Sequence, residues 1–203
     1  MRTNTALGPL HDEAAFSLGE LLVVCAVTAV ISAAAMPRVL GFQERSRAVA
    51  AAKYLAARLQ EARMEALKRS AHVAVSFAQA GGDIAFACFV DGNGNGVRTI
   101  EIAGGIDRNL WPAERLGDQV PGAQFGIVAG TPSIDGSGPL TGTDPIRMGR
   151  SDLVSFSPLG SVTPGTIYVH GPERKPWAVR TTGATGRVRV YEFDAASQTW
   201  QAR

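Results

Sequence analysis

The feature that most constrains this chain is an apolar run near its beginning, from Phe16 to Met36. The run is 21 residues long and contains one charged side chain, Glu20. As an α-helix it would extend about 30 Å, which is enough to cross the hydrocarbon core of a bilayer. A charged side chain near the centre of such a helix costs roughly 2.5 to 3.5 kcal/mol. The run therefore predicts a transmembrane helix over residues 16–36, and Glu20 needs a separate explanation.

A cleavable secretory signal is the first alternative interpretation of this run. Its leader would contain one basic residue, Arg2, while Asp12 and Glu13 come shortly before the apolar stretch. Secretory signals usually have positive charge there, and helical patterning continues beyond Pro37. These features favour a helix that stays in the mature protein over a secretory signal that is removed. A mature protein that begins near Met36 would indicate the secretory alternative.

Residues 37–70 predict a helix that continues beyond the apolar run. Small and apolar side chains recur in steps of four and three residues, which is typical of a buried helical stripe. The stripe consists of Ala48, Ala52, Leu55, Leu59, Ala62 and Ala66. The other positions are rich in Arg, Lys and Glu, which indicates a solvated face. A kink is expected at the start of this segment, because Pro37 removes a backbone hydrogen bond and Gly41 lowers helix propensity.

The remainder of the chain, residues 71–203, predicts an antiparallel β-rich domain. Short runs of β-branched and aromatic residues alternate there with Gly, Pro and Asn. The expected strands are HVAVSFA (72–78), IAFACFV (84–90), VRTIEI (97–102), QFGIV (124–128), LVSFS (153–157), TIYVH (166–170), WAVRTT (177–182) and RVRVYEF (187–193). Residues 121–149 are rich in Gly and Pro and predict an irregular loop. The fold class is therefore α+β, with a long N-terminal helix packed on the β-rich domain.

The sequence AFSLGELLVV, which begins at Ala15, resembles the N-terminus of type IV prepilins and of type II secretion pseudopilins. The shared pattern is a short leader, a small residue, Phe, Ser or Thr, Leu, a small or apolar residue, Glu and a long apolar run. The resemblance implies a leader over residues 1–15, cleavage between Ala15 and Phe16 by a prepilin peptidase, and methylation of the Phe16 amine. Ala15 stands where the family usually has Gly. Pro37 falls where many pilins have a helix-kinking proline.

The same resemblance implies a role for Glu20 in assembly. In a filament, a carboxylate one turn from the mature N-terminus can pair with the positively charged amine of a neighbouring subunit, so correct register stabilises a charge that is costly in lipid. The other interpretation is a carboxylate that only reaches the headgroups near the helix end. The resemblance further implies a single-pass inner-membrane protein with an extracytoplasmic C-terminal domain. Basic residues are more frequent after the run than before it, so the positive-inside rule alone predicts the opposite orientation.

The C-terminal third resembles the GspH/FimT family of minor pseudopilins. The similarity lies in a Phe-x-Pro-x-Gly turn at residues 156–160, the sequence GTIYV, and a closing Gly186-Arg187-Val188-Arg189 segment. It implies a pilin-like fold and a minor subunit near the tip of a type II secretion pseudopilus or type IV pilus. The implied partners are other pseudopilins or pilins, the prepilin peptidase and the inner membrane, with no small-molecule substrate.

Arg187 and Arg189 are two residues apart on an expected strand and therefore point to the same outward face. In some competence-associated members of this family such a segment contacts DNA, and paired arginines neutralise phosphates in a salt-dependent way. A DNA-uptake pilin is the main rival hypothesis. The alternative is that both are ordinary solvent-facing residues, because a net charge of +2 steers polyanions weakly.

Asp91, Asn93 and Asn95 match the first positions of a calcium-binding loop. The twelfth position is Ile102, the nearest carboxylate, Glu101, comes one residue early, and no helix is expected on either side of the loop. A structural hairpin turn is therefore the preferred interpretation. The three His are scattered, and the sequence shows no nucleophile paired with a base, no metal cluster and no phosphate loop. We expect no cofactor and no enzymatic activity.

Overall fold

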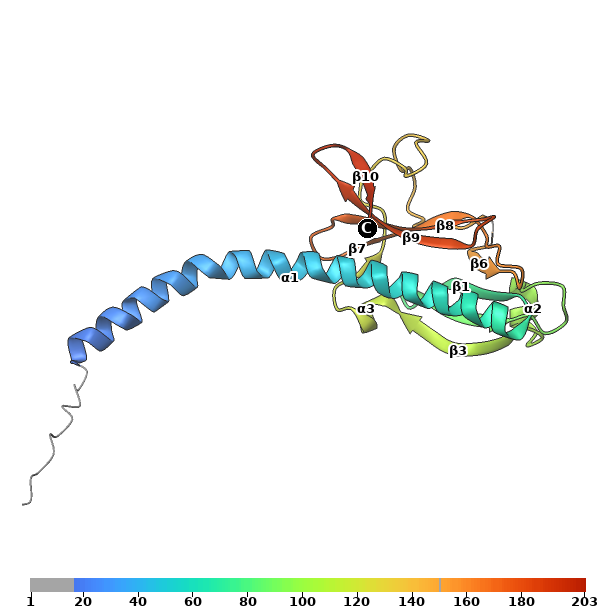
Figure 1. Cartoon of the computed structure of the whole chain (residues 1–203), viewed down its shortest axis with the longest axis horizontal. Coiled ribbons are helices and arrows are strands. Elements are labelled where there is room, and N and C mark those ends of the chain that lie inside the picture. Colours follow the sequence, from blue (N-terminus) through green and yellow to red (C-terminus); the bar gives the residue numbers. More distant parts are fainter. Residues whose placement is uncertain (1–16, 150) are drawn as a thin grey trace, which may run out of the picture. The chain divides into compact units, whose positions relative to one another are not determined.

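The structure, a computed structural model, describes residues 17–149 and 151–203, without the side chains of residues 34–45. The chain divides into two compact units, residues 1–41 and 42–203 (Figure 1). The predicted leader over residues 1–15 and the cleavage site at Ala15 and Phe16 lie outside the described residues.

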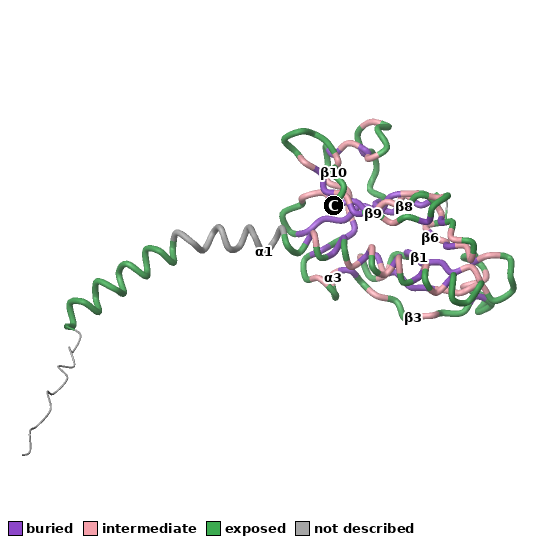
Figure 2. Tube along the Cα trace, viewed as in Figure 1, coloured by how far each residue is buried: buried purple, intermediate pink, exposed green. Residues whose placement is uncertain are grey.

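The first unit is described as one helix. Helix α1 extends from Leu18 to Arg69 and continues into the second unit. Every described side chain of the first unit, from Ser17 to Ala33, is exposed (Figure 2). Among the described residues, no helix has both the length and the apolar character needed to cross a membrane. The kink expected at Pro37 concerns a residue whose side chain is not described, and it stays a prediction.

In the second unit, α1 buries one continuous stripe. The six stripe residues predicted from the sequence, from Ala48 to Ala66, are each at most 2% exposed, and Ala51 joins them at 0%. Figure 2 shows this part of the helix with buried and exposed positions alternating around it. Because five of the seven buried residues are alanines, the sheets can approach the helix closely, while Leu55 and Leu59 fill the remaining space. The predicted stripe is confirmed.

Two antiparallel sheets complete the second unit. In the first sheet the strand order is β3-β2-β1-β6, and in the second it is β10-β9-β8-β7, with β4 and β5 both paired to β7. The elements after α1 are β1 (Val73–Ala80), β2 (Asp83–Val90), α2 (Thr99–Ala103), β3 (Arg108–Arg115), α3 (Leu116–Gln119), β4 (Gln124–Phe125), β5 (Ile146–Arg147), β6 (Leu153–Phe156), β7 (Gly165–His170), β8 (Pro176–Thr182), β9 (Arg187–Asp194) and β10 (Thr199–Ala202). The predicted α+β class with antiparallel sheets is confirmed.

The main core joins α1 to both sheets. Leu59 of α1 belongs to one buried cluster with Phe86 of β2 and Val179 of β8. On the opposite face of the second sheet, a smaller cluster forms around Tyr168 and Ala178, with Leu140 from the long loop packed on it. Both faces of this sheet therefore carry apolar residues, and the outer face is only partly covered.

A polar cluster connects α1 to strand β3. The Arg58 guanidinium lies 4.0 Å from the centre of the Trp111 ring and forms an ion pair with Glu114. The Tyr54 hydroxyl donates a hydrogen bond to the Glu114 carboxylate at 2.5 Å. Cation–π contacts and charge-assisted hydrogen bonds of this kind favour one position of the edge strand against the helix.

The prediction of a strand over residues 97–102 is wrong, because helix α2 begins there at Thr99. The Asp107 carboxylate accepts the backbone N–H groups of Gly92 at 3.1 Å and Arg98 at 2.9 Å, and so closes the loop before the helix. The backbone N–H of Ile102 then donates to the Arg98 carbonyl at 2.9 Å. The expectation that no helix adjoins the Asp91 loop is therefore wrong as well.

Three strands of the described residues have no counterpart in the prediction: β3, β10 and the two-residue β5. Pro112 makes the β3 sequence untypical of a strand, but β3 lies at a sheet edge, where a missing N–H is tolerated. The predicted irregular loop over residues 121–149 is confirmed in the main, since its only strands in the described part are the two-residue β4 and β5. The strand predicted over residues 124–128 is reduced to Gln124–Phe125.

Candidate functional site

The start of α1 is closed by a reciprocal pair of hydrogen bonds. The backbone N–H of Ser17 donates to the Glu20 carboxylate, and the backbone N–H of Glu20 donates to the Ser17 hydroxyl, both at 3.2 Å. This arrangement is a capping box, in which two N–H groups that lack helical partners are satisfied by side chains. Glu20 thus has a local structural role that the sequence analysis did not foresee, although the Ser-x-x-Glu spacing signals it.

The helix surface that follows the capping box is apolar and exposed. Leu18 is 78% exposed and Val30 is 70% exposed, and the other large side chains of this segment are also exposed: Leu21, Leu22, Val23, Val24, Val27 and Ile31. Exposed apolar surfaces of this kind are typical of membrane or protein contacts.

The Gly-Arg-x-Arg segment forms the start of strand β9. Arg187 and Arg189 are both exposed, whereas Val190 is buried, so the predicted outward orientation of the two arginines is confirmed. Arg189 lies opposite Arg180 of β8, and Arg187 lies opposite Thr182. The segment therefore contributes to a wider basic face than the sequence indicated.

Gly186 brings together three parts of the second unit. Its φ is +59°, and an added Cβ would lie 2.1 Å from the carbonyl oxygen of Gly160 and 3.1 Å from Nε of Arg63. The Arg63 side chain of α1 also donates to the Thr185 carbonyl at 3.4 Å. The Phe-x-Pro-x-Gly turn, the Gly-Arg-x-Arg segment and α1 thus meet at one point, which explains why glycine occupies position 186.

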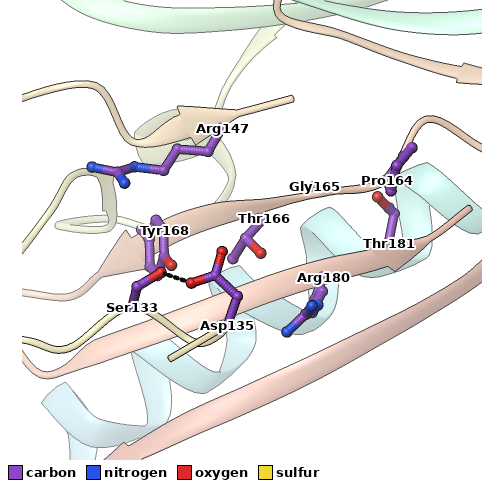
Figure 3. A pocket seen from close by; sticks show the side chains of 9 residues that line it. All are labelled: Ser133, Asp135, Arg147, Pro164, Gly165, Thr166, Tyr168, Arg180 and Thr181. Carbon is purple, nitrogen blue, oxygen red and sulfur yellow. Dashed lines mark hydrogen bonds between the residues drawn. The ribbon is translucent and has the colours of Figure 1, made fainter. Parts of the chain in front are cut away.

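A pocket of about 220 Å³ lies on the outer face of the second sheet, beside the basic face. Figure 3 shows its lining, which comes from the long loop, from strands β5, β7 and β8, and from the residue before β7: Ser133, Asp135, Arg147, Pro164, Gly165, Thr166, Tyr168, Arg180 and Thr181. The Ser133 and Ser137 hydroxyls donate to the Asp135 carboxylate at 2.6 and 2.7 Å, and these bonds lower its pKa to about 2. No local pattern in the sequence indicates this pocket, because its residues come together only through strand pairing.

A family comparison identifies the protein class. A sequence model described as "Type II transport protein GspH" matches residues 51–190, more than half of the 203 residues. The chain belongs to the GspH family. The match covers most of the buried part of α1 and extends through the Gly-Arg-x-Arg segment, in agreement with the resemblance found in the C-terminal third. No curated protein and no solved structure matches significantly.

As a member of the GspH family, the chain belongs to the general class of minor pseudopilins of type II secretion and pilus systems. The match begins at residue 51, so it does not include Ala15, Phe16 or Glu20. Their roles in cleavage, methylation and assembly stay predictions.

The Asp91 loop of this GspH-family chain is held by its own backbone. The Asp91 carboxylate accepts N–H groups from Asn93 at 3.0 Å, Gly94 at 2.8 Å and Gly96 at 2.6 Å, and these hydrogen bonds lower its pKa against the opposing effect of burial. The Asn93 and Asn95 side-chain amides both donate to Glu101, which is how α2 is joined to the loop. Within residues 17–149 and 151–203, no group of three or more metal-ligating His, Cys, Asp or Glu side chains is present.

Proposed function

We propose that this chain is a minor pseudopilin that is processed by a prepilin peptidase and assembled near the tip of a type II secretion pseudopilus or a related type IV pilus. The observation that carries the proposal is the GspH family match over residues 51–190, joined in sequence to a prepilin-like N-terminus. In this proposal residues 1–15 are the leader and residues 16–36 anchor the protein in the inner membrane. The β-rich domain is extracytoplasmic.

The exposed apolar side chains of the first unit support the anchor. Eight large apolar residues between Leu18 and Ile31 are each more than half exposed. Burial of one such side chain in lipid or against another subunit contributes about 1.5 to 3 kcal/mol. A surface of this kind needs an apolar partner, and a bilayer followed by a helical filament core would supply one.

Glu20 would act as the assembly residue. Its capping hydrogen bonds to Ser17 are both 3.2 Å long, at the upper end of the normal range. A charge-assisted bond to the Phe16 amine of a neighbouring subunit would be shorter and stronger. Replacement of the capping bond to Ser17 by a bond to the neighbouring amine therefore costs little free energy. Before assembly, the capping box keeps the Glu20 carboxylate at the start of the helix.

Glu20→Gln tests this role with the helix cap preserved, because Gln can serve in a capping box as well as Glu. We expect the variant to fractionate with the inner membrane like the wild type but to be lost from sheared filament preparations. Ser17→Ala is the matched control, since it removes the hydroxyl half of the capping box and keeps the charge, and it should still assemble. Normal incorporation of Glu20→Gln would contradict the assembly role. Mass spectrometry that finds a start near Met36 instead of methylated Phe16 would contradict processing.

The outward-facing arginines of β9 favour one second candidate, DNA binding. Arg187 and Arg189 are exposed, and Arg180 lies directly opposite Arg189. Each arginine that neutralises a phosphate contributes roughly 0.9 to the slope of log K against log salt. The detergent-solubilised full chain should then bind duplex DNA, and Arg187→Gln with Arg189→Gln should lower that slope by about 2. Arg98→Gln with Arg174→Gln is the matched control, and salt-independent or absent binding would remove this candidate.

A further inference from the structure

Three arginines form one row across the outer face of the second sheet. Strand register places Arg147 of β5 opposite Thr166 of β7, Thr166 opposite Arg180 of β8, and Arg180 opposite Arg189 of β9. Neighbouring strands lie about 4.8 Å apart, so the row spans roughly 14 Å. Residues at directly paired positions point to the same face, which brings these guanidinium groups onto one surface.

The row lacks acidic partners in the described part of the chain. No ion pair there includes Arg147, Arg180 or Arg189. Like charges directly opposite each other destabilise a sheet. Arg147 donates to one loop carbonyl, that of Thr141, at 2.5 Å, and Arg180 to that of Ile134 at 3.4 Å. A guanidinium has five N–H donors, so both arginines keep donors for a ligand.

The Thr166 hydroxyl opens onto the pocket and is free for a ligand. Thr166 is 7% exposed, and its hydroxyl makes no hydrogen bond with the residues that the structure describes. In Figure 3 its side chain lies among those of Asp135, Tyr168 and Arg180. A ligand atom or water in the pocket can therefore form a hydrogen bond with this hydroxyl. The pocket volume of about 220 Å³ exceeds the roughly 150 Å³ of an apolar cavity that holds benzene, so the pocket has room for a side chain.

The charges around the pocket select the ligand. Arg147 and Arg180 contribute two positive charges, and Asp135 contributes one negative charge, so the lining carries a net charge of +1. Asp135 is ionised at neutral pH, and the hydroxyls of Ser133 and Ser137 lower its pKa further, to about 2. A singly charged carboxylate neutralises the net charge of this lining, whereas a phosphate dianion would leave one negative charge uncompensated and is repelled by Asp135 twice as strongly as a carboxylate.

We propose that the pocket between Arg147 and Arg180 binds the carboxylate of an acidic side chain presented by a partner protein. Arg147 and Arg180 hold the carboxylate from two sides, and Thr166 donates its hydroxyl from the floor of the pocket. Asp135 acts as the selectivity element that disfavours phosphate. The inference depends neither on membrane anchoring nor on cleavage at Ala15.

Peptide titrations followed by NMR amide shifts of the detergent-solubilised full chain test the proposal. One Gly-Ser peptide is made in three forms, with Glu, Gln or phosphoserine at its centre. The Glu peptide should shift the signals of Thr166 and Arg180 and bind more tightly than the other two. Equal binding of the Gln peptide, or tighter binding of the phosphoserine peptide, would overturn the proposal. Glutarate that binds as tightly as the Glu peptide would overturn the assignment to a partner protein, and duplex DNA that displaces the peptide would assign the pocket to nucleic acid.

Four variants give the site its residue-level test. Arg147→Gln and Arg180→Gln should each weaken Glu-peptide binding about tenfold, as expected for the loss of one hydrogen bond to a charged group. Thr166→Val keeps the shape and should weaken binding less, while Asp135→Asn should shift the preference toward phosphoserine. Arg98→Gln is the control, and each variant must keep the wild-type thermal midpoint. Unchanged binding in both pocket arginine variants would overturn the proposal.

Discussion

Helix α1 has two different surfaces in its two units. From Ser17 to Ala33 every side chain is exposed, although the apolar residues there are large. From Ala48 to Ala66 a stripe of mostly small residues is at most 2% exposed. The same helical geometry therefore leads to burial only where the chain itself supplies the sheets that cover it. In the first unit, the described residues supply no such cover.

The residue types in the two units fit this difference. The first unit has β-branched side chains at Val23, Val24 and Val27, which present bulk to the surroundings. The second unit has alanines that permit close approach, together with leucines that fill the core. One helix, α1, thus has a first part whose side chains suit contacts with other molecules and a second part whose side chains suit packing inside the domain.

The largest expected effect comes from truncation of the buried stripe. Leu59 is 0% exposed and belongs to the main core, so Leu59→Ala should lower the free energy of unfolding of the second unit by about 2 to 5 kcal/mol. Val30→Ala, at a position that is 70% exposed, should change it by less than about 0.5 kcal/mol. Urea titration of the detergent-solubilised full chain measures both. Equal losses of unfolding free energy in the two variants would contradict the distinction between the two surfaces.

The next effect concerns the contact of α1 with the Gly186 turn. Gly186→Ala places a methyl group 2.1 Å from the Gly160 carbonyl oxygen at a φ of +59°, and a non-glycine residue in this conformation alone costs about 1 to 3 kcal/mol. Gly105 has a similar φ of +71° and open space around it, so Gly105→Ala measures the cost of backbone strain alone, without a steric clash. The Gly186 variant should be the less stable of the two in thermal unfolding. If both lose the same stability, the close approach to Gly160 has no energetic role.

Features with a local period could be predicted from the sequence, and features that depend on register could not. The stripe of α1 follows from helical spacing, and the outward orientation of Arg187 and Arg189 follows from strand alternation. By contrast, the pairing of Arg147 with Thr166 and of Thr166 with Arg180 joins residues on separate strands. No local propensity encodes that alignment, so the pocket and its arginine row could not be found.

Two errors in the predicted elements arise where contacts outside the segment decide its structure. The segment at residues 97–102 has β-branched residues typical of a strand, but the Asp107 carboxylate binds the loop backbone and helix α2 follows. Strand β3 was missed because Pro112 argues against a strand except at a sheet edge. Both outcomes depend on contacts made at a distance along the chain, which outweigh local preference.

A smaller effect is expected at the capped start of α1. Ser17→Ala removes one partner of the capping box and should destabilise the first turn by about 1 kcal/mol. Amide hydrogen exchange at Leu21, whose N–H donates to the Ser17 carbonyl, should become faster. Ser32→Ala, an exposed position inside the same helix, is the control. The change should stay within the first unit, and altered exchange in the β-strands would show that the two units are coupled.

The last effect, which is confined to strongly alkaline pH, is a pH dependence at the partly buried Tyr54 of α1. Burial, together with the hydrogen bond to Glu114, raises the pKa of Tyr54 from 10.0 to about 12. Between pH 10 and 12 the unfolded chain loses this proton while the folded chain keeps it, so the free energy of unfolding falls as pH rises through this window. Ultraviolet difference absorbance should show one tyrosine that ionises near pH 12. Tyr54→Phe should remove this part of the pH dependence. Glu114→Gln should reduce it without removing it, because burial of Tyr54 still raises the pKa. An unchanged pH dependence in Tyr54→Phe would mean that Tyr54 is not buried between α1 and β3.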